Sequence, residues 1–243
     1  MIVDTMTYPE ICEEFLRIHR EFMPKYMQKI WEGSPCYNKI RKYMMKNKER
    51  SYVVFPPFSW HVDHNTTFYC APQCVSYNVM KKMGLGGIPF LVFRYRSTLM
   101  AIEVSGFFSD HFKIYTQHFI DRYIERFLKT DISREEAFCH YIMYNRNSVY
   151  TENPDKEGNM VGASNDVVVF ADYDGKIFLL RTCITQKMLF ESQTEYTDEL
   201  KKLVLELNSE EKDFGESLSH RDMKKISSHF KKNREHRDNN RNT

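Results

Sequence analysis

The chain has 243 residues, of which 42% are hydrophobic and 14% aromatic, and its formal net charge is +2. This composition predicts a globular protein with a sizeable core and excludes a disordered chain. The net charge is too small to imply nucleic-acid binding from composition alone, so a nucleic-acid site must depend on where the charges lie.

No apolar run reaches the roughly 20 residues that a helix needs to cross a bilayer. The opening stretch MIVDTMTYPEICEEF carries acids early and lacks a basic segment before an apolar one, so we expect no signal peptide. Six cysteines are spread along the chain, mostly in apolar contexts. Without an export signal we expect them to be reduced thiols, which predicts a cytoplasmic protein with no membrane partner.

Two predicted helices open the chain. Residues 8–31 repeat apolar residues at intervals of three and four, and Pro24 is expected to kink or split this helix. Residues 37–48 predict the second helix. Short runs rich in β-branched and aromatic residues then predict the strands of a meander, at 51–55, 66–71, 90–96, 99–106 and 112–116.

Helices and one hairpin follow in the second half. Residues 117–128 predict a helix packed on the sheet, and a further helix is expected to begin after Ser133, its N-cap. A polar, glycine-containing loop is expected at 153–165. The run 167–185 predicts a β-hairpin, and the Asp-Gly pair at 174–175 is its expected turn.

A helix at 194–207 is expected to close the folded part, and a basic tail follows it. Residues 221–243 hold eight Lys and Arg against three acids, a local charge of +5. We expect a helix up to about Asn233 and disorder beyond it. The predicted fold class is therefore α+β, with N-terminal helices, a predominantly antiparallel β-sheet with packed helices, and a basic C-terminal tail. Its parts are expected at 1–50, 51–208 and 209–243.

The helix at 117–128 carries a row of basic side chains. On a wheel at about 100° per residue, its polar residues gather on one side and its large apolar residues on the other. His118, Arg122 and Arg126 are spaced four residues apart and form one ridge. The pattern is typical of an amphipathic helix with a solvated face and i,i+4 ion pairs. The same pattern also suits a row of catalytic and phosphate-binding side chains in an active site.

The chemical requirements of RNA cleavage explain why this ridge would suit an active site. Cleaving RNA without a metal needs a group that moves a proton near pH 7, and histidine is suited to that step. It also needs fixed positive charge on the phosphate, for which the planar fork of arginine is the better choice. The ridge would supply both kinds of group.

Three short motifs occur here in a particular order: T-x-H-x-x-x-R-x-x-x-R from Thr116, I-S-x-E-E from Ile132, and a hairpin that ends in RT-x-IT. In this order they resemble the barnase/EndoU/RelE-like family of small nuclease domains, in particular its phage- and toxin-associated members. The resemblance covers roughly residues 116–188 and implies a nuclease-like part from about residue 110. It implies a ribonuclease in which His118 transfers the proton, Arg122 and Arg126 clamp the phosphate, and Thr182 or Thr185 donates a hydroxyl hydrogen bond.

A second group of candidate residues lies in WHVDHNTTFYCAPQC. His61, His64, Cys70 and Cys74 are all able to bind zinc. The flanking residues predict loop and strand, however, and along an extended strand residues 61 and 64 point to opposite faces. A loop with packed cysteines is the alternative. If the first half contributes to an active site, His61 and His64 are its best candidates.

Further basic residues are candidates for nucleic-acid binding. Arg94 and Arg96 alternate with aromatic residues on a predicted strand, which suits phosphate or single-stranded nucleic acid. The alternative is an edge strand with its polar face outward. In the tail, charge alone could hold RNA or an acidic partner through Lys224, Lys225, Lys231 and Lys232. A solubilising tail is the alternative there.

The sequence therefore predicts a metal-independent endonuclease that acts on RNA and needs no cofactor. Two alternatives stay open: a non-catalytic protein that binds nucleic acid or another protein, and a metal-dependent hydrolase built on His61 and His64. The pair Cys139-His140 could suggest cysteine–histidine catalysis. Neighbours on a helix point about 100° apart, so we expect a core cysteine beside a surface or hydrogen-bonded histidine.

Overall fold

The computed structural model describes residues 1–50, 52–104, 111–145, 148–152, 159–164, 167–185 and 188. The helices are α1 (Tyr8–Ile30), α2 (Pro35–Lys46), α3 (Tyr77–Met83), α4 (Gln117–Tyr123), the π-helix η1 (Ile124–Leu128) and α5 (Arg134–Tyr144). The strands are β1 (Val53–Val54), β2 (Phe58–His61), β3 (Thr66–Cys74), β4 (Gly86–Tyr95), β5 (Thr98–Val104), β6 (Phe112–Tyr115), β7 (Ser148–Glu152), β8 (Asn159–Ser164), β9 (Val167–Tyr173) and β10 (Ile177–Thr185).

All strands of the described residues join one sheet, in the order β1-β3-β4-β5-β6-β10-β9-β8-β7, and β2 pairs with β3 off this path. Neighbouring strands are antiparallel except β6 and β10, which run parallel. The predicted α+β class with a predominantly antiparallel sheet is therefore confirmed. The parallel pair was not expected, because a meander of local hairpins does not contain one. It requires a crossover, and the chain between β6 and β10 includes α4 and α5.

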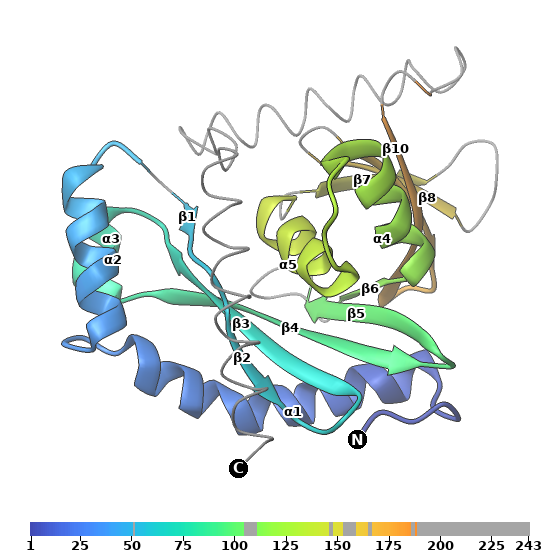
Figure 1. Ribbon diagram of the computed structural model, residues 1–243, viewed down its shortest axis with the longest axis horizontal. Helices are drawn as coiled ribbons and strands as arrows, with labels where there is room; N and C mark the ends of the chain where they lie inside the picture. Colours follow the sequence, from blue (N-terminus) through green and yellow to red (C-terminus); the bar gives the residue numbers. More distant parts are fainter. Residues whose placement is uncertain are drawn as a thin grey trace.

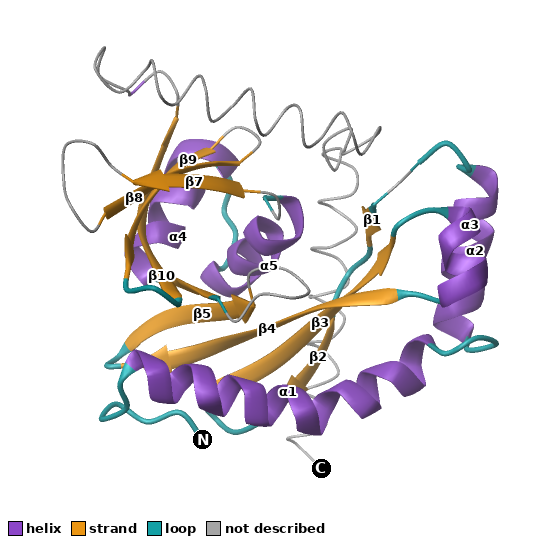
Figure 2. Cartoon of the chain, turned by 180° about the vertical axis from the view of Figure 1, so that it is seen from behind, coloured by secondary structure: helices purple, strands orange, loops and turns teal. Residues whose placement is uncertain are grey.

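The two faces of the sheet carry different helices (Figure 1). Side chains alternate between the faces along each strand. On β4, Leu91 and Phe93 join the core with α1 and α2, whereas Phe90 and Val92 join the core with α4 and α5. Figure 2 shows α1 lying along the outer face while the sheet curls around α4 and α5. The central strands, such as β3 and β6, are thus buried on both faces, as their continuous apolar character requires.

Helix α1 runs without interruption through Pro24, so of the two expectations, a kink or a split, the split is wrong and the kink stays a prediction. Its inner residues Ile11, Phe15 and Ile18 are fully buried. This burial stabilises the helix against the loss of the backbone hydrogen bond at Pro24.

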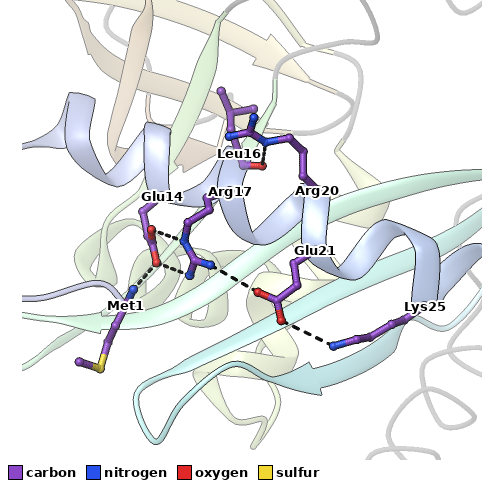
Figure 3. Close-up of polar contacts among 7 residues, drawn as sticks. All are labelled: Met1, Glu14, Leu16, Arg17, Arg20, Glu21 and Lys25. Atoms are coloured by element: carbon purple, nitrogen blue, oxygen red, sulfur yellow. Dashed lines mark hydrogen bonds and ion pairs between the residues drawn. The ribbon is translucent and has the colours of Figure 1, made fainter.

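The outer face of α1 is charged (Figure 3). Arg17 contacts Glu14 at 2.7 Å and Glu21 at 3.4 Å, and Lys25 lies 3.6 Å from Glu21. The hydrogen bond from Arg17 is the main cause that lowers the pKa of Glu14 to about 2. Exposed pairs of this kind contribute little stability, so the apolar inner face fixes the helix.

Several elements depart from the predicted ones. Helix α3 and strands β2, β7 and β8 were not expected, and β8 lies inside the predicted loop at 153–165. Gly162 allows β8 to lie close to its neighbours in the sheet. A Cβ there would lie 2.5 Å from the ring of Tyr150 on β7, so the glycine lets the two strands pack closely. The hairpin turn at 174–175 is confirmed, with Gly175 at a positive φ of 91°.

Other predictions concern the ends of the chain and its cysteines. The helix at 194–207 and the basic tail lie outside the described residues. All six cysteines are free thiols. Across the part of the chain that the structure describes, no helix is long and apolar enough to span a membrane.

Candidate functional site

A pocket of about 650 Å³ opens where the tips of β2, β3 and β4 meet α4 and the start of α5. Its polar lining includes His61, His64, Thr67, Arg94, Gln117, Asp121, Arg134 and Glu135. Its apolar lining is Val92, Leu99, Ile124 and Ile132. The volume lies in the range of small-molecule sites, which are mostly lined by apolar side chains, whereas most of the side chains that line this pocket are polar.

The two histidines reach this pocket because the chain turns between them. His61 is the last residue of β2 and pairs with Thr67 of β3, whose hydroxyl lies 3.2 Å from Nδ1 of His61. In the turn, the Asp63 carboxylate accepts a hydrogen bond from the amide of Asn65. His64 is exposed and makes no hydrogen bond or ion pair with any described residue. The prediction that residues 61 and 64 face apart assumed an extended strand, and the turn removes that assumption.

Arg94 supplies a positive charge to the same pocket. It lies near the end of β4, and its backbone amide donates to the carbonyl of Asn65, which ties it to the histidine-bearing turn. Its side chain is exposed and has no hydrogen bond or ion pair among the described residues. The guanidinium is therefore available to an anion that enters the pocket.

Arg96 does not accompany Arg94. It lies in the β4–β5 turn, where its amide donates to the carboxylate of Asp4 at 2.6 Å and its guanidinium stacks over the ring of Tyr95. The expected pair of arginines on one sheet face is therefore wrong, because the strand ends at Tyr95. The edge-strand alternative is also wrong, because β4 lies between β3 and β5.

The helical wall of the pocket carries charges that already have partners. Arg134 contacts Asp121 at 2.6 Å, and this hydrogen bond is the main cause that raises the pKa of Arg134. The Glu135 carboxylate accepts a hydrogen bond from the hydroxyl of Tyr69. Ser133 caps α5, as predicted. Of the cations lining the pocket, Arg94 is therefore the one without a partner among the described residues.

The predicted ridge lies beside the pocket and does not line it. His118 is exposed on α4. Arg122 contacts Glu125 at 2.6 Å, and Arg126 donates to the backbone carbonyl of Cys183 at 2.5 Å. Arg122 is thus bound within its own helical segment, whereas Arg126 ties η1 to β10. The half-buried Thr182 and Thr185 of β10 also lie outside the pocket lining.

The helix that carries the ridge changes its geometry halfway. It is α-helical up to Tyr123 and then becomes the π-helix η1, closed by the hydrogen bond from the amide of Lys129 to the carbonyl of Ile124 at 2.8 Å. A wheel at 100° per residue does not hold beyond Tyr123, because a π-helix has more residues per turn. The wider turn begins at Ile124, which lines the pocket.

The four possible zinc ligands do not come together. Cys70 and Cys74 are buried in the core shared with α1, while His61 and His64 are exposed at the pocket. Burial raises the pKa of Cys74 to about 11 and that of Cys70 further. No group of three or more metal-ligating side chains occurs within the described ranges. Cys70 and Cys74 are packed core cysteines, which was the alternative interpretation.

Cys139 and His140 are buried in the core, and His140 has a partner, as expected. Nδ1 of His140 lies 2.9 Å from the hydroxyl of Tyr123, which also accepts a hydrogen bond from Asn145. Burial lowers the pKa of His140 to about 4. This neutral imidazole is part of a structural network that joins α4 to α5.

No family model, curated protein or solved structure matches this chain. The resemblance to the barnase/EndoU/RelE-like nucleases stays a prediction that rests on the three short motifs. The lysines of the tail, Lys224, Lys225, Lys231 and Lys232, lie outside the described residues. The candidate site is therefore the pocket, and its interpretation rests on its own side chains.

Proposed function

We propose that the protein is a metal-independent ribonuclease and that RNA is cleaved in this pocket. One observation carries the proposal: two histidines, His61 and His64, line the same cavity as an arginine that has no hydrogen bond or ion pair among the described residues. Cleavage of RNA by its own 2′-hydroxyl needs one group to accept a proton, a second to donate one, and a cation on the phosphate. His61, His64 and Arg94 match that requirement.

The reaction would proceed by an in-line displacement. One imidazole removes the proton of the 2′-hydroxyl as its oxygen forms a bond to phosphorus. The bond from phosphorus to the 5′-oxygen breaks, and the other, protonated imidazole gives its proton to that leaving oxygen. The Arg94 guanidinium holds two phosphate oxygens and stabilises the charge that builds on them. The products are a 2′,3′-cyclic phosphate and a free 5′-hydroxyl.

Two features support separate duties for the histidines. The hydroxyl of Thr67 holds Nδ1 of His61 and so fixes the orientation of that ring. His64 lies in a turn and is exposed, so its ring is able to follow the leaving group. We assign proton removal to the oriented His61 and proton donation to His64.

The test compares two exposed histidines without partners among the described residues, one in the pocket and one on the ridge. A fluorescent RNA oligonucleotide is incubated with wild type, His64→Ala and His118→Ala, each with and without EDTA. We expect cleavage by wild type and by His118→Ala, a loss of about 10²–10⁴-fold in His64→Ala, and no effect of EDTA. Cleavage lost in His118→Ala and kept in His64→Ala would return the active site to the ridge.

A second candidate function is a nucleotide-binding pocket that performs no chemistry. The volume of about 650 Å³ favours it, because this space suits one nucleotide whether or not a bond is broken. Binding of RNA by wild type without any 2′,3′-cyclic product would support this function over the ribonuclease.

We further propose a cytoplasmic location with RNA as the partner. All six cysteines are free, and five of them are buried, which suits a reducing compartment. Free thiols in protein isolated from its own cell would support this location.

A further inference from the structure

One side chain of the pocket has a fixed orientation and an unused donor group. Gln117 is the first residue of α4, directly after the N-cap Thr116. Its Oε1 accepts a hydrogen bond from the backbone amide of Leu99 on β5 at 2.9 Å. β6 ends at Tyr115, so beyond that point the Gln117 side chain takes the place of a strand carbonyl beside β5.

The chemistry of this contact settles which way the amide points. A backbone N–H only donates, so the oxygen of the Gln117 amide must face Leu99 and the NH₂ group must face away. Gln117 lines the pocket, and its Nε2 has no hydrogen bond to any described residue. The pocket thus holds a donor that is fixed in place before any ligand binds.

The position of this donor relative to Arg94 is set by the sheet. Arg94 and Leu99 are cross-strand partners on β4 and β5. Gln117 accepts a hydrogen bond from Leu99 on the other side of β5, just beyond the end of β6. Two strand spacings of about 4.8 Å place the backbone of Gln117 about 10 Å from the backbone of Arg94. A nucleotide spans a comparable distance from its phosphate to the far edge of its base. The partly exposed apolar side chains of Leu99 and Ile124 lie along the same pocket and offer a surface to the base.

From this arrangement, and resting on the proposed function, we infer that Gln117 selects the base next to the phosphate at Arg94. The edge of the base that is farthest from the sugar faces Gln117. The NH₂ group of Gln117 donates a hydrogen bond to an exocyclic oxygen on that edge. Uracil and guanine present an oxygen at this position, whereas cytosine and adenine present an amino group. Two donors facing each other leave both unpaired, so the pocket prefers the keto bases.

The test reverses the donor without removing the contact to β5. In Gln117→Glu one carboxylate oxygen still accepts from Leu99, and the other turns the free group from a donor into an acceptor. Binding of uridine 3′-monophosphate and cytidine 3′-monophosphate is measured by calorimetry. We expect wild type to prefer the uridine nucleotide by roughly 5- to 150-fold, the range of one good base contact, and Gln117→Glu to prefer the cytidine nucleotide.

Two control variants keep the result interpretable. Gln28→Glu makes the same change on the exposed face of α1 and should leave the preference as in wild type. Gln117→Met removes the donor and should abolish the preference while inorganic phosphate still competes for the pocket. A merely structural role of Gln117 would not move the ratio of the two nucleotides.

The outcomes separate this inference from the proposed function. Equal binding of the two nucleotides by wild type, an unchanged preference in Gln117→Glu, or no binding of either nucleotide would overturn it. A preference that reverses as expected in a protein that cleaves no RNA would support the role of Gln117 and overturn the ribonuclease.

Discussion

The two polar sides of one helical segment, α4 with η1, use their side chains differently. On the ridge, Arg122 and Arg126 are bound to Glu125 and to a backbone carbonyl. On the pocket side, Gln117 keeps a donor that is unused among the described residues, and it lines the same pocket as Arg94, which also lacks a partner there. The ridge carries more arginines, but both of them are bound to other residues. The pocket has Arg94, whose guanidinium is available to a ligand. A charged side chain is available to a ligand only where no other residue of the protein already binds it.

The largest expected effect concerns Arg94, the available cation. Arg94→Ala should lower kcat/KM for RNA by about 10²–10³-fold, because one preorganised donor on a developing charge typically contributes that much. Its free energy of unfolding should change by less than about 0.5 kcal/mol, since the side chain is exposed. Initial rates on the oligonucleotide and urea unfolding measure the two quantities.

Arg96→Ala is the matched control for Arg94→Ala. Arg96 lies two residues further along but is bound to Asp4 outside the pocket, so RNA cleavage should stay as in wild type. Equal losses in both variants would mean that a diffuse basic surface, and not the pocket, holds the RNA.

The next effect concerns His140, the buried histidine behind the helix. Its pKa is lowered to about 4, whereas an unfolded histidine has a pKa of about 6.5. The unfolded chain therefore binds a proton that the native protein does not bind, and stability falls as the pH is lowered from 6.5 toward 4. The expected loss is about 3 kcal/mol in the free energy of unfolding.

This pH dependence must be separated from that of the pocket. Urea unfolding of wild type and His140→Asn at pH 7 and pH 4.5 isolates the contribution of His140, because other titrating groups are common to both. The variant should lose less stability between the two pH values than wild type loses. Equal losses would mean that another buried group causes the acid sensitivity.

Much of the fold followed from local patterns. The apolar period predicted α1 and α2, the N-cap Ser133 predicted the start of α5, and the Asp-Gly pair predicted the last hairpin. The parallel pairing of β6 with β10 did not follow, because no local signal specifies which distant strands meet. Strand β8 was hidden for a related reason, since it is short and is defined by its pairing with β7 and β9, where Gly162 lets Tyr150 pack closely.

The candidate site was predicted in pieces. His61, His64 and Arg94 were each named from the sequence, but nothing in it said that they share a pocket. Their meeting depends on the turn after β2 and on the pairing of β3 with β4. Gln117 was missed, because a lone glutamine has no motif. The ridge was found easily because it lies within one helix, where spacing in sequence gives position in space.

The smallest expected effects test whether the ridge is structural. Arg126→Ala removes a charged donor from the carbonyl of Cys183, so the free energy of unfolding should fall by about 1–2 kcal/mol. Arg122→Ala breaks an exposed pair with Glu125 and should cost less than about 1 kcal/mol. RNA cleavage per folded molecule should stay at the wild-type rate in both. A variant that keeps its stability but loses cleavage would show that the ridge contacts RNA, because a side chain that only supports the fold affects the rate through the fraction of protein that is folded.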